Sequence, residues 1–401
     1  MTPAELDAAD PLAHFRQRFA LPKGVLYLDG NSLGPLPHAV AAAVADATTR
    51  QWGDRLVRHW NEGWIDAPER IGAKIAPLIG AMPGEVIVAD STSANLFKVI
   101  VAVLRAYPDR HTIVSELGNF PTDLHIAEGA VGCVPGARLK AVPRDKLAGA
   151  IDSDTALVLL THVHYKTAER FDLDAWTKAA HGAGALILWD LSHSVGAVSL
   201  DLAAAGADLA VGSTYKYLNG GPGAPAFLYV AARHQSAMRN PLSGWMGHAE
   251  PFAFEDGYRP APGMKRWLVG TPPILGLAAL EAALDLWADV DMAHVTAKSA
   301  ALFDILVAAG DSIGLECVSP RDPAKRGSHI SFRHRHGYAL TQALIARGVI
   351  GDFRDPDILR LGLTPLYLSH ADVAEAAEIL RETLETRAYE APEFSKRNAV
   401  T

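Results

Sequence analysis

Short apolar runs recur through the middle of the chain, and turn residues bound each of them. Residues 155–163 and 185–189 are examples. Runs of this length are typical of strands that are buried on both faces of a sheet. Stretches with the apolar spacing of helices lie between them, such as residues 172–182. From residue 86 to residue 230 the pattern predicts alternating strands and helices, which is the order of a mainly parallel sheet with right-handed crossovers.

The order changes after residues 257–273, a segment rich in proline and glycine. A long helix is predicted over residues 275–309, and its stripe of large apolar residues is expected to lie in the core. The strands and helices that follow predict a small α+β domain. We therefore expect an N-terminal arm and turn (1–38), a large domain (39–272) and a small C-terminal domain (273–401). The stripe comprises Leu277, Leu280, Leu284 and Trp287.

Composition narrows the class of protein. The chain has 401 residues, 49% of them hydrophobic and 20% charged, with a net charge of -8. These values predict a globular protein with ample core for an enzyme, and they argue against a nucleic-acid partner. We expect no membrane partner, because we see neither a span nor an export signal. Cys133 and Cys317 are too few for a disulfide framework or a zinc cluster, so we expect no metal and a cytoplasmic location.

Two charged residues follow predicted strands. Asp190 ends the run over residues 185–189, and Lys216 comes after the run over residues 209–212. Open α/β sheets bind ligands at the edge where such strands end. Pyridoxal phosphate needs a lysine for its Schiff base and an acid facing its pyridine nitrogen. The pair therefore indicates a pyridoxal phosphate site.

Neighbouring polar groups favour this interpretation over a simpler one. Asp190 could merely cap a helix, and Lys216 could be a solvated loop residue. His193 and the hydroxyls of residues 213–215 suit a phosphate and a ring edge, whereas a cap needs only one polar group. Lys166 is the rival Schiff-base lysine, but no glycine-rich segment follows it as residues 220–223 follow Lys216.

A second polar group opens the helix that is predicted to end at Ala106. Thr92 and Ser93 follow the apolar run at residues 86–90. Hydroxyls at this position are ordinary helix caps. The same position offers free backbone N–H groups and a favourable dipole, which bind phosphate. Together with Asp190 and Lys216, the phosphate interpretation is preferred.

Motifs along nearly the whole chain give a narrower indication. The sequence resembles the fold type I enzymes that depend on pyridoxal phosphate and, among them, the kynureninase family. This resemblance implies an α/β large domain with a mainly parallel seven-stranded sheet and a small C-terminal α+β domain. The motifs are Tyr27-Leu-Asp-Gly-Asn-Ser-Leu-Gly34, Asn95-Leu-Phe97, Phe120-Pro-Thr-Asp123, Trp189-Asp-Leu-Ser-His193, Thr214-Tyr-Lys216-Tyr-Leu-Asn-Gly-Gly-Pro-Gly223, Gly244-Trp-Met-Gly-His248 and Arg360-Leu-Gly-Leu-Thr-Pro-Leu-Tyr367.

The resemblance also implies a role for each matching residue. Lys216 would hold the cofactor and move the Cα proton, Asp190 would pair with the pyridine nitrogen, and Tyr215 would donate a proton. Arg360 would clamp the substrate carboxylate, and Trp245 and Thr271 would reach a phosphate across a dimer interface. The implied cofactor-binding set is Thr92, Ser93, Phe120, Pro121, Thr122, Asp123, Asp190, His193, Tyr215, Lys216, Trp245 and Thr271, and the implied substrate-binding set is Arg360, Trp64, Asn31 and Ser32.

The activity that the resemblance implies is hydrolytic Cβ–Cγ cleavage of L-kynurenine to anthranilate and L-alanine by a homodimer. This reaction belongs to tryptophan catabolism and NAD biosynthesis. Trp64 and Thr271 match family members that prefer L-kynurenine over 3-hydroxykynurenine, so we expect the same preference. Residues 164–171 depart from the family pattern and receive no role.

Three rival functions stay open from the residues alone. A cysteine desulfurase would need a thiolate on a mobile loop, which neither cysteine suits. An aminotransferase could use Arg360 and Lys216 equally well. A non-catalytic binding protein with this fold would have no need of Lys216, Asp190 and Arg360 together.

Overall fold

A seven-stranded sheet forms the centre of the large domain. In this computed structural model, which describes residues 2–397, the strand order is β2-β8-β7-β6-β5-β3-β4. All neighbours pair in parallel except β8, which is antiparallel to both β2 and β7. The mainly parallel sheet agrees with the expectation. The strands are β2 (Val86–Val88), β3 (Thr112–Glu116), β4 (Arg138–Val142), β5 (Thr155–Thr161), β6 (Leu186–Asp190), β7 (Leu209–Gly212) and β8 (Phe227–Val230).

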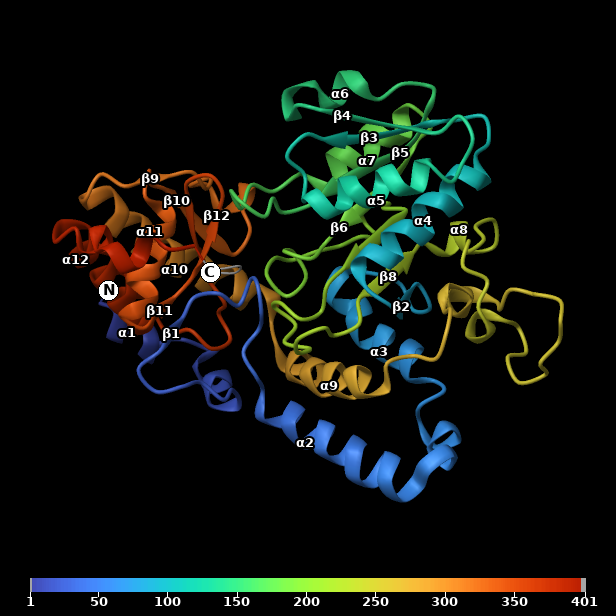
Figure 1. Cartoon of the computed structure of the whole chain (residues 1–401), viewed down its shortest axis with the longest axis horizontal. Helices are drawn as coiled ribbons and strands as arrows, with labels where there is room; N and C mark the ends of the chain where they lie inside the picture. The colour runs from blue at the N-terminus through green and yellow to red at the C-terminus, as the bar shows by residue number, and fades with distance from the viewer. Residues whose placement is uncertain (1, 398–401) are drawn as a thin grey trace.

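Helices cover both faces of this sheet (Figure 1). Alternate strand residues enter two separate cores: Leu157 and Leu188 pack with α4, whereas Val158 and Ile187 belong to the core on the other face. Burial on both faces explains why these strands appear in the sequence as continuous apolar runs. The helices of this region are α2 (His38–Asp46), α3 (Ala67–Ile75), α4 (Thr92–Ala106), α5 (Pro121–Val131), α6 (Leu147–Ala150), α7 (Leu173–Gly182), α8 (Ala232–Gln235) and α9 (Ile274–Leu284).

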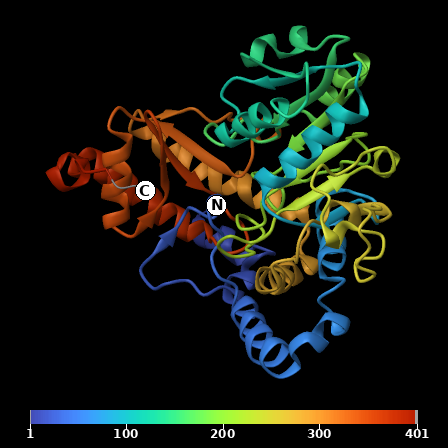
Figure 2. The same cartoon turned by 45° about the vertical axis from the view of Figure 1, so that its right-hand side comes forward.

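The C-terminal region contains a four-stranded antiparallel sheet in the order β12-β13-β10-β9. The N-terminal segment joins it, because β1 (Leu26–Tyr27) pairs in parallel with β11 (Val349–Ile350). Figures 1 and 2 both show the N-terminal segment beside this region. The remaining elements are α1 (Pro3–Ala8), β9 (Glu316–Cys317), α10 (Met292–Ser312), β10 (His329–Arg333), α11 (Gly337–Ala346), β12 (Asp352–Arg354), β13 (Ile358–Gly362) and α12 (His370–Glu385).

The helix expected over residues 275–309 is two helices, α9 and α10. A short 3₁₀ turn over Asp285–Asp289 separates them, and Asp291 caps α10 by accepting a hydrogen bond from the backbone of Ala293. The predicted stripe is buried as expected, from Leu277 to Trp287. Both helices and the turn between them pack against the core, so the apolar pattern continues through the turn. The pattern therefore gives no sign that one helix ends there.

Contrary to the sequence analysis, one helix is long and apolar enough to cross a membrane. It is α10, and 33% of its most apolar window is buried inside the protein. Its buried residues, such as Leu302 and Phe303, belong to the main hydrophobic core. A core helix passes the same test, so this feature alone is weak evidence for a membrane span.

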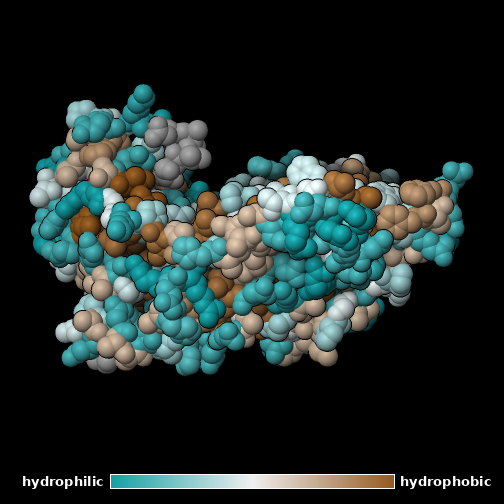
Figure 3. Space-filling model, turned by 90° about the horizontal axis from the view of Figure 1, so that it is seen from below, coloured by the Kyte–Doolittle hydropathy of each residue, from teal (hydrophilic) through white to brown (hydrophobic). Residues whose placement is uncertain are grey.

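Two segments of the large domain project from its body. The helix α2 and residues 47–62 form one, and residues 240–262 form a loop at the right of Figure 1. Figure 3 shows apolar surface at that right-hand end of the molecule. The two segments expose large apolar side chains, among them Trp52, Leu56, Val57, Trp245, Phe252 and Phe254.

Candidate active site

The candidate site lies along one edge of the large sheet. Because β2, β3, β5, β6 and β7 point the same way, their carboxyl ends meet at this edge. Thr92 and Ser93 follow β2, and Phe120 and Asp123 follow β3. Asp190 ends β6, and Lys216 lies in the loop after β7. A parallel sheet therefore gathers residues that are far apart in the sequence.

Lys216 is almost fully buried, with 8% of its surface exposed. Its Nζ lies 3.3 Å from Nδ1 of His193 and 6.0 Å from the ring centre of Phe120. Burial lowers the pKa of Lys216 to about 8, although the charge of Asp190 acts in the opposite direction. An amine with such a pKa is partly unprotonated near neutral pH, as a Schiff-base lysine must be to react.

The segment that carries Lys216 is held against the N-terminal turn. The backbone N–H of Gly34 donates to the carbonyl of Tyr215 at 2.8 Å. A Cβ at Gly34 would lie 2.2 Å from the carbonyl oxygen of Lys216, so only glycine permits this close approach. The glycine of the N-terminal motif thus positions the lysine.

Two buried carboxyl groups lie next to each other below Lys216. Asp123 and Asp190 are 1% and 3% exposed. Burial raises the pKa of both groups, and the charge of Asp190 raises that of Asp123 further. Thr161 donates to Asp123 at 3.0 Å, and the backbone N–H of Ser192 donates to Asp190 at 2.8 Å. Two buried carboxylates side by side are costly to ionise. A protonated ring nitrogen facing Asp190 would supply an opposite charge and stabilise the ionised form.

The first turn of α4 suits a phosphate. Ser91 caps this helix by accepting a hydrogen bond from the backbone of Ala94. The N–H groups of Thr92 and Ser93 come before the first intrahelical bond, so they remain available to an anion. With Lys216 and Asp190 at the same sheet edge, the residues present fit pyridoxal phosphate. Tyr215 is half-buried, and burial raises the pKa of its phenol, so the phenol is protonated at neutral pH.

Arg360 comes from the small sheet and is 1% exposed. Its Nε donates to Oδ1 of Asp352 at 2.8 Å, its Nη2 to Ser32 at 2.7 Å, and its Nη1 to the carbonyl of Tyr165 at 2.6 Å. Its Nη1 also lies 3.5 Å from Nε2 of His193, which connects the arginine to Lys216. The structure therefore brings Arg360 and Ser32 to the same place as the lysine.

Several neighbours of Arg360 were missed by the sequence analysis. They include Asp352, Arg354 and Asp29, which form a charged cluster, and His329, a fully buried imidazole 5.9 Å from the ring of His193. The alternation Asp352, Arg354 before Arg360 was a usable signal, since residues two apart in a strand share a face. Asn31 is fully buried against Gly362, and its amide has no partner among the described residues.

Three expected site residues lie elsewhere in the chain. Trp64 donates to Gln51 and lines a cavity of about 410 Å³ beside α9. Trp245 packs its ring against Phe252, and Thr271 is exposed. Within residues 2–397, none of the three makes a hydrogen bond or ring contact with Lys216 or Arg360.

The two cysteines do not join the site, and the rival lysine, Lys166, lies beside it next to Tyr165. The thiol of Cys133 lies beyond the far end of α5, about 15 Å of helix from Phe120. Cys317 is on β9 and contacts the carbonyl of Ser319. Lys166 places its Nζ over the ring of Tyr165, at 5.7 Å, and its carbonyl accepts a hydrogen bond from Ser331. These positions favour Lys216 as the reactive lysine.

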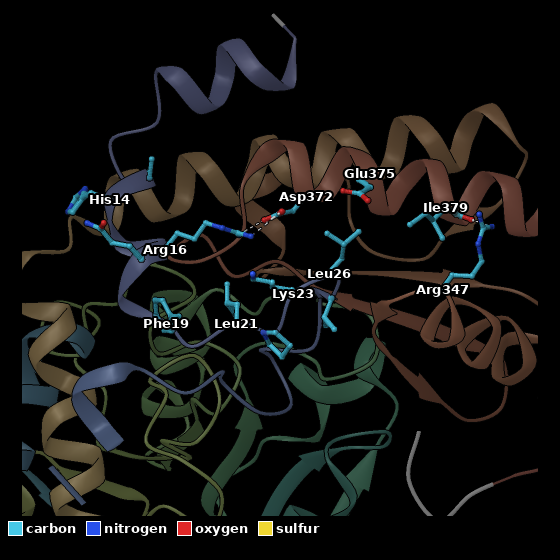
Figure 4. A pocket seen from close by; sticks show the side chains of 15 residues that line it. His14, Arg16, Phe19, Leu21, Lys23, Leu26, Arg347, Asp372, Glu375 and Ile379 are labelled. Atoms are coloured by element: carbon cyan, nitrogen blue, oxygen red, sulfur yellow. Dashed lines mark hydrogen bonds and ion pairs between the residues drawn. The ribbon is translucent and has the colours of Figure 1, made fainter. Parts of the chain in front are cut away.

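A cavity of about 870 Å³ lies away from this site, between the N-terminal arm and α12 (Figure 4). Its two arginines are already paired, because Arg16 contacts Asp372 and Arg347 contacts Glu382. It contains none of the expected site residues, so we assign it no part in the chemistry.

Comparisons with known proteins agree with this geometry. A family model described as the kynureninase C-terminal domain matches residues 295–380. A protein named kynureninase from Burkholderia pseudomallei is 51% identical and covers 99% of this chain and 98% of its own length. The chain belongs to the kynureninase family. It is therefore a pyridoxal phosphate-dependent hydrolase that acts on carbon–carbon bonds.

Solved structures support the fold of this kynureninase-family chain. A cysteine desulfurase from Thermococcus onnurineus has a TM-score of 0.80 at 18% identity and covers 93% of this chain and 98% of its own. A C-DES mutant with glycine covalently linked to its PLP cofactor also has a TM-score of 0.80 at 18% identity, and it covers 92% and 99%. At such identities the likeness shows the fold type I architecture alone.

Proposed function

We propose that this protein hydrolyses the Cβ–Cγ bond of L-kynurenine and releases anthranilate and L-alanine. The observation that carries the proposal is the position of Lys216. Its buried amine lies at the edge of the sheet near Asp190, and His193 connects it to Arg360. An amine, an acid and a carboxylate-binding arginine around one space suit an amino-acid substrate of a pyridoxal phosphate enzyme.

The residues of the chain divide the work of the reaction. When bound, pyridoxal phosphate supplies an electron sink for the negative charge that develops at the substrate Cα. Lys216 holds the cofactor and then moves the proton of the substrate Cα, a task that suits its pKa of about 8. Asp190 would keep the ring nitrogen of the bound cofactor protonated, and Phe120 would help to hold the ring. Tyr215, protonated at neutral pH, donates a proton as alanine forms.

The phosphate would be held by the first turn of α4 through Thr92 and Ser93. His193, Pro121, Thr122 and Asp123 complete the cofactor-binding set. Burial lowers the pKa of His193 well below its ordinary value, and the nearby cations lower it further, so this imidazole is neutral. A neutral ring between Lys216 and Arg360 can accept a hydrogen bond without adding charge.

The substrate would bind through Arg360, with Ser32 and Asn31 beside it. Arg360 forms charge-assisted hydrogen bonds to the α-carboxylate, and its planar fork can make two at once. Burial and the ion pair with Asp352 keep this guanidinium in one orientation.

The working enzyme would be a homodimer. The support is that Trp245 lies on a projecting segment that exposes apolar side chains, while Trp64 and Thr271 follow the two projecting segments in the chain and make no contact with Lys216 among the described residues. A second copy would cover these segments and bring the three residues to the partner's site. We also propose a cytoplasmic location, which the two free cysteines support, a role in tryptophan catabolism, and a domain boundary near residue 272.

The test is a direct assay of the purified protein loaded with pyridoxal phosphate. Adding L-kynurenine should change the cofactor absorbance and release fluorescent anthranilate together with alanine. Alanine released without any keto acid present excludes an aminotransferase. Sulfide released from cysteine with no anthranilate from L-kynurenine would favour a desulfurase and contradict the proposal.

A further inference from the structure

The guanidinium of Arg360 is held along one edge by a single carboxylate. Asp352 accepts from both Nε and Nη2 of Arg360, the first at 2.8 Å. These two residues are directly opposite each other on β12 and β13, so their side chains share one face of the sheet. A carboxylate that occupies the Nε and Nη2 edge leaves the Nη1 and Nη2 edge to face a ligand.

The other contacts of Arg360 are neutral. Ser32 donates its hydroxyl to Asp352 at 2.6 Å and accepts from Nη2 of Arg360 at 2.7 Å. The other two neutral contacts are made by Nη1, which donates to the carbonyl of Tyr165 at 2.6 Å and lies 3.5 Å from Nε2 of His193, on the side where Lys216 lies. A substrate carboxylate could therefore replace the neutral contacts on the outer edge while Asp352 stays in place.

The charges around Arg360 leave room for one more anion. Arg354 also donates to Asp352, at 2.6 Å. The two arginines and Asp352 together carry one net positive charge. Asp352 remains a carboxylate, because Arg360 and Arg354 hold its pKa below the ordinary value in spite of burial. Burial and the charge of Asp352 raise the pKa of Asp29 to about 7, so this neighbour carries only about half a negative charge at neutral pH and the cluster stays positive.

We propose that Asp352 is a positioning residue that aims the outer edge of the Arg360 guanidinium at the substrate α-carboxylate. This inference rests on the proposed function, which assigns that carboxylate to Arg360. Asp352 does not touch substrate. It acts through the orientation of Arg360, and Ser32 completes the arrangement from the N-terminal turn.

Because Asp352 is charged, a positioning role and a purely electrostatic role predict different effects of its replacement on carboxylate binding. Asp352→Asn removes a negative charge next to the binding site, so Coulomb attraction alone predicts tighter binding of a carboxylate. Positioning predicts weaker binding, because the guanidinium loses its bidentate anchor. Displacements of about 1 Å can cost about 100-fold. The two views therefore differ in sign.

The experiment compares two ligands that differ only in the carboxylate, L-alanine and ethylamine. Each is titrated into the cofactor-loaded protein, and its dissociation constant is read from the cofactor absorbance. In Asp352→Asn the preference for L-alanine over ethylamine should fall about tenfold or more, as expected when charge-assisted hydrogen bonds lose their alignment. The KM for L-kynurenine should rise more than kcat falls.

A second variant keeps the charge and moves it. Asp352→Glu shifts the carboxylate by one methylene, so the preference should also fall, but less than with Asn. If Asp352→Asn does not fold, this variant alone decides the question. An unchanged or increased preference in the folded variants would overturn the inference.

Asp208→Asn is the matched control. Asp208 is 1% exposed and accepts from Arg233 at 2.6 Å and from His181 and His234 at 2.8 Å. It lies just before β7, at the opposite edge of the sheet from Lys216. This variant loses a buried ion pair of the same kind and should lose stability while its preference for L-alanine stays unchanged.

The wild-type titration separates the two proposals. A wild-type protein that binds L-alanine and ethylamine equally would contradict the role of Arg360 in the proposed function. A wild-type preference for L-alanine that Asp352→Asn retains would contradict only the role of Asp352.

Discussion

Lys216 and Arg360 are both buried at the candidate site, but the pKa values of the groups around them are shifted in different ways. Around Lys216, burial raises the pKa of Asp123 and Asp190 and lowers that of Lys216 and His193. Around Arg360, opposite charges are paired closely, and the pKa of Asp352 is lowered. Around Lys216 burial therefore moves the groups toward neutrality, whereas at the other end the paired Arg360 and Asp352 keep their charges.

The difference matches the roles that we propose for the two ends. Proton transfer needs groups whose pKa values lie close to the working pH, and desolvation achieves this shift. Recognition of a carboxylate needs a permanent cation in a fixed orientation, which an ion pair provides. The large domain supplies the first environment through a parallel sheet edge. The small domain supplies the second through two antiparallel strands.

The largest effect is expected at the proton-transfer end. Lys216→Ala should lower kcat by about 10⁴-fold or more, since it removes both the attachment point and the proton carrier. Circular dichroism should show an intact fold. Lys166→Ala, the control at the rival lysine, should keep near-normal activity. Retained activity in Lys216→Ala would place the Schiff base elsewhere.

Arg360→Lys tests the end that keeps its charges. Lysine preserves the charge but cannot make the bidentate pair, which should cost about 1.5–3 kcal/mol, or about 10–150-fold in KM for L-kynurenine. Affinity for pyridoxal phosphate, measured by titration of the apoprotein, should change little. Loss of cofactor with an unchanged KM would show that Arg360 serves the cofactor instead.

Substrate preference tests the part of the site that a second copy would supply. L-kynurenine should exceed 3-hydroxykynurenine in kcat/KM by about tenfold, because Trp64 and Thr271 offer the extra hydroxyl a poor polar partner. The double variant Trp64→His and Thr271→Asn should narrow or invert this ratio. Competition assays that show equal use of both substrates by the wild type would exclude the idea.

The smallest expected effect is the pH dependence of cofactor attachment to Lys216. Because burial lowers the pKa of Lys216 to about 8, its reactive free amine increases as pH rises through that value. Attachment of pyridoxal phosphate to the apoprotein should speed up about fivefold from pH 7 to pH 8 and level off above pH 9. Stopped-flow absorbance measures this rate. A rate that still climbs steeply at pH 10 would mean that the amine is not desolvated.

Local patterns predicted much of the fold because burial on both faces leaves a direct mark on a strand. The runs at residues 155–163 and 185–189 became β5 and β6 with ends within two residues of the prediction. The prediction of one helix over residues 275–309 was wrong for the same reason, because a turn that is buried in the core leaves the apolar pattern unbroken. For the candidate site, Lys216 and Asp190 were predicted from their places after strands, and the structure places both at the same edge of the sheet.

The amino-acid sequence by itself determined the class of fold and the family, and it predicted Lys216 and Asp190 as the reactive lysine and its acid. These features depend on residue type and on spacing along one element, which the chain carries locally. Only the tertiary structure decided that Asp352 holds Arg360, that Asp123 and Asp190 share one buried space, and that Trp64, Trp245 and Thr271 lie apart from Lys216. Those relations depend on desolvation and on contacts between distant segments, and neither exists until the chain is folded.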